Sequence, residues 1–235
     1  SCLHVGEIMK LDLKKSKLRQ INEKLQTVGI KKNQRIFTII NPEGNHAICA
    51  GLKDDIDVTI KGHTGYYCAG MNQNASITID GNVGTGVAEN MMSGKVHVKG
   101  NASQSAGATA HGGLLIIDGD ASSRCGISMK GADIVVKGSV GHMCAFMAQS
   151  GNILICGDAG DALGDSIYET EIFVKGKVKS LGADCVEKKI ENKHEKLINK
   201  MLQESGIKNL KSSQFRRYGS ARNLYNFKID NLSSY

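Results

Sequence analysis

The chain has 235 residues, of which 28 are glycine and none is tryptophan, a size that suits one solenoid with flanking segments. Its longest apolar stretches, residues 114–117 and 143–148, are far shorter than the roughly 20 residues of a membrane-spanning helix, so we expect no membrane association. The formal net charge of +7 is concentrated at the ends, and the body between them is acidic. It lacks the basic stripe of a nucleic-acid reader, so we expect no nucleic-acid partner either.

The first predicted element is a helix within an N-terminal arm that we assign to residues 1–35. Three apolar residues recur there at helical spacing, followed by Gly29 as a stop: Leu18, Ile21 and Leu25. We expect this helix to lie across the N-terminal end of the fold, because uncovered terminal coils of a solenoid expose strand edges. Residues 35–52 then predict strand, proline turn and strand, which is the pattern of an irregular first coil.

The centre of the chain is a repeat of nineteen residues, marked by seven glycines: Gly62, Gly81, Gly100, Gly119, Gly138, Gly157 and Gly176. A short fixed period is typical of a solenoid. Apolar residues stand four and two positions before each glycine: Val58 and Ile60, Ile77 and Ile79, Val96 and Val98, Leu115 and Ile117, Ile134 and Val136, Ile153 and Ile155, Ile172 and Val174. Alternate residues of a strand face one side, so these pairs predict interior ladders with rungs about 4.8 Å apart.

The pattern predicts an all-β protein, a single-stranded parallel β-helix of about seven coils over residues 36–187, right-handed by the crossover rule. We expect each repeat glycine to permit a backbone bend that a Cβ would resist. The position seven residues later is always Ala or Gly, which predicts a corner where chain layers approach closely. The position before each glycine alternates in charge and predicts a surface ladder: Lys61, Asp80, Lys99, Asp118, Lys137, Cys156 and Lys175. The position after it lacks the recurring aspartates of a calcium-binding roll.

The last predicted segment, residues 188–235, contains a second helix over 188–205 and an extended basic tail. We expect the helix to cover the C-terminal end of the solenoid. The tail mixes aromatic and basic side chains, so we expect it to pack as an extended segment on a surface and to be removable without unfolding the solenoid. Its candidate partner-contacting residues are Arg216, Arg217, Tyr218, Arg222 and Tyr225.

Candidate catalytic groups do not form a set in the sequence. Cys68, Cys125 and Cys144 share one register, but two neighbouring thiols are too few for a metal or cluster, and small buried cysteines are the better interpretation. Cys2 is not the first residue, as an amidotransferase nucleophile would have to be. The glycine-rich residues 81–86 open no helix and are explained by the repeat. The sequence therefore predicts no catalytic, cofactor-binding or metal-binding residue in this chain, and cysteines without a disulfide pattern predict a reduced, cytoplasmic location.

Several stretches of this chain resemble one family: GYYCAGMN (65–72), GVAENMMSGKV (86–96), SSRCGISMKG (122–131), GHMCAFM (141–147), GDALGDSIYE (160–169), KSLGADCVEK (179–188) and FRRYGSARNLYNF (215–227). They are similar to the carboxy-terminal GXGXG domain of the glutamate synthase large subunit, and most similar to the stand-alone members of that family. A more distant resemblance, through the repeat, is to the C subunit of formylmethanofuran dehydrogenase.

The resemblance implies a non-catalytic subunit in glutamate biosynthesis and ammonia assimilation. Its partners would be a glutaminase-like amidotransferase and a synthase-like subunit that carries FMN and an iron–sulfur cluster, and this chain would help hold the ammonia passage between them. An N-methylglutamate synthase-like complex, with methylamine in place of ammonia, and a homo-oligomer stay open. An enzyme or sugar-binding module that uses a groove on the solenoid is a further alternative. The scarcity of aromatic residues in the body disfavours it.

Overall fold

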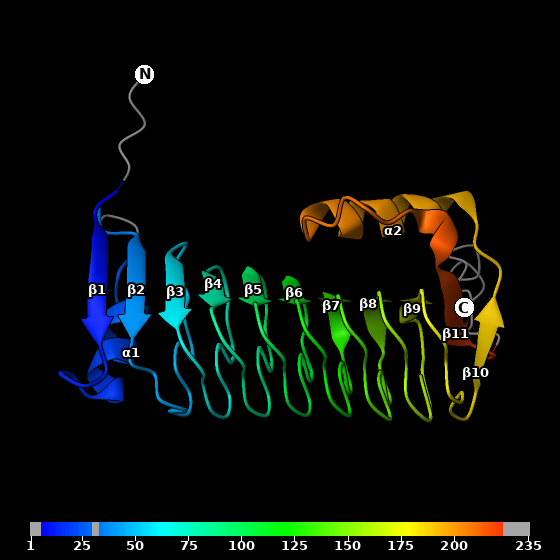
Figure 1. The fold of residues 1–235 in the computed structure, drawn as a ribbon, viewed down its shortest axis with the longest axis horizontal. Helices are drawn as coiled ribbons and strands as arrows, with labels where there is room; N and C mark the ends of the chain where they lie inside the picture. The colour runs from blue at the N-terminus through cyan, green and yellow to red at the C-terminus, as the bar shows by residue number, and fades with distance from the viewer. Residues whose placement is uncertain (1–5, 30–32, 223–235) are drawn as a thin grey trace, which may run out of the picture.

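The computed structural model describes residues 6–29 and 33–222, and these residues form a long β-solenoid (Figure 1). The strands are β1 (Ile8–Asp12), β2 (Ile36–Ile40), β3 (Asp57–Lys61), β4 (Ser76–Ile79), β5 (Lys95–Val98), β6 (Leu114–Ile117), β7 (Lys130–Val136), β8 (Ser150–Ile155), β9 (Glu171–Val174), β10 (Cys185–Lys188) and β11 (Arg216–Ser220). The helices are α1 (Leu18–Gln26), α2 (Asn192–Glu204) and a short 3-10 helix, η1 (Ser212–Gln214).

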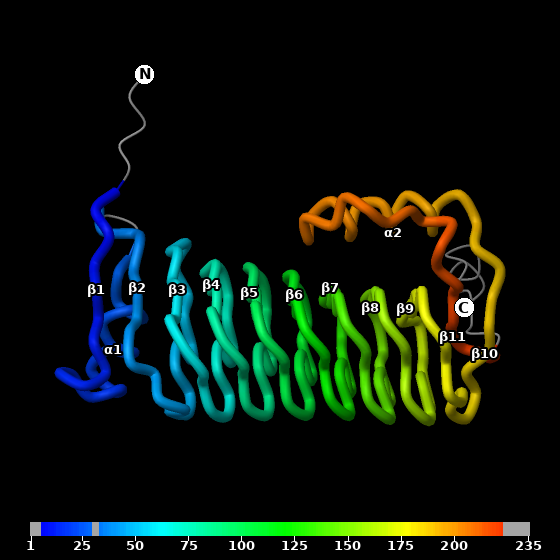
Figure 2. The backbone as a smooth tube through the Cα atoms, in the orientation of Figure 1, coloured from blue at the N-terminus to red at the C-terminus, as the bar shows by residue number. Residues whose placement is uncertain are grey.

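Strands β1 to β9 pair in parallel in chain order, and each turn of the tube in Figure 2 is one coil. From β3 to β9 the paired residues are nineteen apart, as in Val58 with Ile77 and Ile77 with Val96, except at a bulge where Lys130 pairs with Ser150. The inward side chains of these strands are almost completely buried and form one continuous apolar cluster. The predicted parallel β-helix of about seven coils and its interior ladders are confirmed. The right-handed winding stays a prediction.

The repeat glycines are required by stacking rather than by a bend. Of the seven, Gly62 alone has a positive φ, at 134°. A Cβ on Gly119 would lie 2.8 Å from the carbonyl oxygen of Gly100, one coil earlier, and 2.1 Å from the side-chain oxygen of Asn101. From Gly100 to Gly176, each glycine N–H donates to the carbonyl of the preceding glycine at 2.8–3.1 Å. The expectation of a bend is therefore wrong, because the glycines let two backbones touch at this corner.

The small residues seven positions after the first six repeat glycines are buried, whereas Ala183, which follows Gly176, is exposed. Ala69, Ala88 and Ala145 are fully buried and have φ between 55° and 60°. A Cβ on Gly107 would lie 2.6 Å from Cδ1 of Ile134, a residue of the opposite strand ladder. The crowding predicted at this register is real, but it arises from aliphatic side chains across a thin core rather than from neighbouring chain layers.

The N-terminal cap is confirmed, and it replaces contacts that a preceding coil would make. Ile21 and Leu25 of α1 are buried in the core. The side chain of Asn22 donates to the carbonyl of Ala47 and accepts from the N–H of Cys49, both at 2.9 Å. The sheet, however, begins within the predicted arm, because β1 precedes α1 and pairs with β2.

The C-terminal helix forms as predicted, but it does not cover the end of the solenoid. It runs along the outer face of the sheet above its C-terminal half (Figure 1). Its apolar side packs on outward-facing strand residues in one cluster: Val135, Leu154, Phe173, Ile198, Met201, Leu202 and Phe215. The end is closed instead by β11, which enters the sheet between β9 and β10 and is antiparallel to both. Residues 216–220 of the tail are thus an integral strand, and the sheet extends past the predicted bounds 36–187.

Candidate functional site

A ladder of side-chain acceptors follows the repeat glycines along one corner of the solenoid. From Asn82 to Lys177, the residue after each glycine donates its backbone N–H to the side chain of its counterpart one coil earlier, at 2.7–2.9 Å. The column reads His63, Asn82, Asn101, Asp120, Ser139, Asp158 and Lys177. The sequence pattern excluded a calcium site here but did not reveal the ladder. The signal for the ladder in the sequence was a run of six successive side chains that can accept a hydrogen bond, followed by one that cannot.

The ladder ends at Lys177, where the corner is left open. In the six earlier coils, the residue two positions after the glycine donates its N–H to the carbonyl of the next coil at 2.9–3.0 Å, as Ala159 does to Lys177. Val178 holds the same position in the last coil. Within the described part of the chain, neither the N–H of Val178 nor the carbonyl of Gly176 has a hydrogen-bond partner.

The antiparallel direction of β11 explains the open corner. Tyr218 pairs with Ile172 and Arg216 with Val174, so β11 takes the place of an eighth coil beside β9. A parallel coil would then continue over Gly176 and Val178. Because β11 begins at Arg216 and runs the other way, no segment within residues 6–29 and 33–222 lies over this corner.

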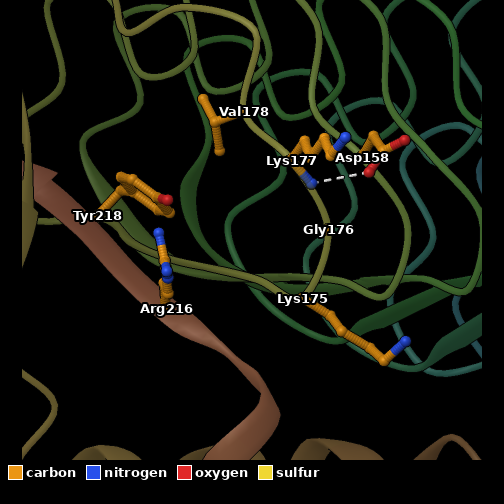
Figure 3. A pocket seen from close by; sticks show the side chains of 7 residues that line it. All are labelled: Asp158, Lys175, Gly176, Lys177, Val178, Arg216 and Tyr218. Carbon is orange, nitrogen blue, oxygen red and sulfur yellow. Dashed lines mark hydrogen bonds between the residues drawn. The ribbon is translucent and has the colours of Figure 1, made fainter.

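The open corner is a pocket of about 670 Å³, within the usual range for ligand sites. Its lining residues come from the last two coils and from β11 (Figure 3): Asp158, Lys175, Gly176, Lys177, Val178, Arg216 and Tyr218. Three of these carry a positive charge and one a negative charge. The Asp158 carboxylate already accepts the N–H of Lys177 at 2.7 Å. A second pocket, of about 500 Å³, shares Asp158, Lys177 and Val178 and lengthens the basic groove.

The residues predicted to contact a partner lie in different surroundings. Arg216 and Tyr218 line the pocket. Burial, together with the charge of Glu187, raises the pKa of the Tyr218 phenol, so this hydroxyl stays protonated. Arg217 is committed to an internal ion pair with Glu171, with 14% of its side chain exposed.

The two remaining candidates are not at the pocket. Arg222 is half-exposed and pairs with Asp184 at 2.7 Å, and its guanidinium lies 5.4 Å from the ring centre of Tyr168. Tyr225 lies outside the described residues. The structure therefore brings two of the five predicted residues together and adds Lys175, Lys177 and Val178, which sequence reasoning did not select.

The three cysteines of the predicted register are buried, as predicted. Cys68, Cys125 and Cys144 are fully buried in one column, and Cys49 occupies the same column one coil before Cys68. A hydrogen bond with Cys125 and burial hold the pKa of the Cys144 thiol well above its usual range, and burial raises the pKa of Cys68 to about 12. Thiols in this state are poor nucleophiles and metal ligands. Across residues 6–29 and 33–222, no three His, Cys, Asp or Glu side chains gather as a metal site would require.

The nineteen-residue coil, the glycine column and the alanine–glycine register define a GXGXG-type β-solenoid. The sequence matches the GXGXG motif family over residues 11–228, and the chain belongs to that family, as a protein like the carboxy-terminal domain of glutamate synthase. It is 52% identical over 225 residues to Protein GlxC of Rhizobium meliloti (strain 1021). That alignment covers 96% of this chain and 99% of the relative. Neither helix of the described residues is long and apolar enough for a membrane span.

Proposed function

We propose that this chain is a non-catalytic subunit of a glutamate-synthase-type complex in glutamate biosynthesis, where it acts as a cytoplasmic scaffold. The observation that carries the proposal is the packed interior. Its inward-facing strand residues are buried in one continuous aliphatic cluster, and the buried thiols of Cys68 and Cys144 are held protonated. Such a chain can contribute outer surfaces to a complex, and family membership supports the identity of that complex.

The proposed partners are a glutaminase-like amidotransferase and a synthase-like subunit that binds FMN and an iron–sulfur cluster. The amidotransferase would release ammonia, and the synthase would join it to 2-oxoglutarate with two electrons from an external reductant, so the two sites must be held in a fixed relation. The solenoid is suited to this role, because its coils stack into one continuous sheet whose outer surfaces can contact both partner subunits. We further propose that the ammonia path runs along an outer surface of the solenoid, since the aliphatic core fills the space between its strands.

Reconstitution tests the proposed function. The chain is purified alone, and then co-expressed with the amidotransferase-like and synthase-like subunits of its source. The isolated chain should show no glutaminase or glutamate-forming activity, whereas the three-subunit complex, supplied with an electron donor such as NAD(P)H, should convert glutamine and 2-oxoglutarate to two molecules of glutamate. Addition of methylamine as a competing amine establishes which amine is transferred. Turnover by the isolated chain, or full activity of the other two subunits without it, would reject the scaffold role.

A further inference from the structure

We propose that the open corner at Gly176–Val178 binds an extended acidic segment of a partner subunit, which adds one further rung to the solenoid. The inference rests on the proposed function in one respect, namely that this chain has partner subunits. Addition of a strand or rung to an incomplete edge is a common form of peptide recognition, in which backbone hydrogen bonds give affinity and side chains give specificity.

The backbone of the last coil supplies one donor and one acceptor at the spacing that the solenoid uses throughout. Each glycine from Gly100 to Gly176 donates its N–H to the glycine carbonyl beneath it, and the residue two positions after the glycine donates to the coil above. The carbonyl of Gly176 and the N–H of Val178 are the corresponding groups of the last rung. An extended segment placed over this rung would donate a hydrogen bond to the carbonyl of Gly176 and accept one from the N–H of Val178. The same pair of bonds joins neighbouring coils from Gly81 to Gly176.

The charges of the pocket select an acidic segment. In the column before the repeat glycines, lysine and aspartate pair across neighbouring coils: Lys61 with Asp80 at 3.4 Å and Lys137 with Asp118 at 2.9 Å. Lys175 ends this column, and no described carboxylate forms an ion pair with it. An aspartate in the added rung would continue the alternation.

Two further cations reinforce this choice. Lys177 also forms no ion pair with any described residue, and Arg216 faces the pocket with its Nε 3.8 Å from Glu187, at the long end of the range for an ion pair. The pocket thus holds three positive charges, from Lys175, Lys177 and Arg216, and one negative charge, from Asp158. The Asp158 carboxylate already accepts a hydrogen bond from the backbone N–H of Lys177. A cationic or neutral segment would leave these groups without counter-charge.

The chain itself provides a probe for this site. Residues 118–123, Asp-Gly-Asp-Ala-Ser-Ser, are part of a rung with aspartate on both sides of the glycine, and they begin after the position that Arg216 already fills beside Val174. The probe is this hexapeptide with blocked ends, and the control peptide has asparagine in place of both aspartates. Calorimetry on the purified chain should show that the acidic peptide binds about tenfold more tightly than the control, a difference of roughly 1.4 kcal/mol.

Hydrogen exchange then locates the bound peptide. The N–H of Val178 should exchange quickly in the free protein and become protected when the acidic peptide is present. The N–H of Ala159, which is bonded to Lys177 at 2.9 Å, should be protected in both states and serves as the internal reference. Binding without protection of Val178, equal binding of both peptides, or displacement of the peptide by an equal concentration of free glutamate would overturn the proposal.

Charge reversal tests the same site within the complex. The variant Lys175→Glu/Lys177→Glu is compared with Lys53→Glu/Lys130→Glu, which changes the net charge equally at exposed positions outside the pocket. The pocket variant should bind the acidic peptide at least about tenfold more weakly and recover less of the partner subunits, whereas the control should behave like the wild type. If both variants recover the partners fully, the docking proposal fails and the scaffold role stands. If the wild type recovers none, the scaffold role fails.

Discussion

Arg217 donates two hydrogen bonds to the carboxylate of Glu171, from Nε at 2.6 Å and from Nη2 at 2.8 Å. A third bond runs from Nη1 to the carbonyl of Lys189 at 2.9 Å. The two side chains are 46 residues apart in the sequence, and their ion pair joins β11 to β9. The bond to Lys189 connects both strands to the segment that leads into α2. These three hydrogen bonds hold β11 in the sheet.

Removal of either partner of this pair should destabilise the protein. Because the side chains of Arg217 and Glu171 are 14% and 24% exposed, the cost lies between those of surface and buried pairs, at about 1–3 kcal/mol for Arg217→Met or Glu171→Gln. The double variant should cost clearly less than the two single changes added together. Urea unfolding of the four proteins measures this. Strictly additive losses would show that the two side chains act independently.

The sequence predicted the solenoid because each coil repeats the same contacts. The apolar pairs before each glycine specify the inward face of seven strands, and Ile21 and Leu25 specify the capping face of α1. Such periodic information is local and occurs many times over, so single irregular positions do not obscure it. The tail has no repeat to reinforce it. The role of Arg217 depends on Glu171, and no spacing rule connects the two.

The position of α2 could have been predicted from the outward face of the strands. The middle strand position reads Thr59, Thr78 and His97 in the early coils, and then Ile116, Val135, Leu154 and Phe173 in the later ones. An apolar column on the outside of a solenoid requires a cover, and α2 provides it over the last three of these residues. The open corner could not be found in this way, because it depends on the direction in which β11 returns.

His194 should make the stability of the protein depend on pH. Its side chain is 4% exposed, and its Nδ1 accepts the N–H of Glu191 at 3.0 Å in a capping box, so the neutral ring is the form that fits. Burial, with the nearby charge of Arg217, lowers the pKa of His194, although Glu171 opposes this shift. The unfolded chain then binds the proton more readily. The stabilisation is complete above the unfolded pKa of about 6.5 and is lost as the pH falls below it.

Thermal unfolding from about pH 8 to about pH 5 measures this dependence. The matched variant is His194→Gln, since glutamine at this position keeps the capping bond and does not titrate. The melting temperature of the wild type should fall more steeply with acidification than that of the variant. Parallel curves would mean that other groups determine the acid sensitivity.

Asn101 tests the acceptor ladder in the middle of the solenoid. Its side-chain oxygen accepts the N–H of Asp120 at 2.8 Å. Asn101→Ala removes this acceptor and should cost about 0.5–1.5 kcal/mol, the usual contribution of one hydrogen bond. Asn101→Ser should retain most of it, because Ser139 fills the same role for Asp158 at 2.9 Å. Hydrogen exchange at Asp120 should accelerate in the alanine variant and not in the serine variant. Equal exchange in both would show that the ladder is dispensable.

Gly119 tests whether stacking or backbone bending explains the glycine column. Gly119 does not have a positive φ, so an alanine could adopt its backbone conformation. Its Cβ would nevertheless lie 2.8 Å from the carbonyl oxygen of Gly100 and 2.1 Å from the Asn101 side chain. Gly119→Ala should therefore cost about 1–3 kcal/mol through forced separation of two coils. Gly6→Ala is the control, because its nearest atom would be 3.8 Å away, and it should be almost neutral.

The double variant Asn101→Ala/Gly119→Ala separates the two clashes. Removal of the Asn101 side chain relieves its contact with the new Cβ at position 119. The contact with the carbonyl oxygen of Gly100 stays, because a side-chain substitution does not remove backbone atoms. The cost of Gly119→Ala should thus be smaller in the Asn101→Ala background and still well above that of Gly6→Ala, as urea unfolding would measure. If Gly119→Ala were as stable as the wild type, the coils would not be held in contact at this corner. The pocket above Gly176, which is the next step of the same glycine column, would then lose its structural explanation.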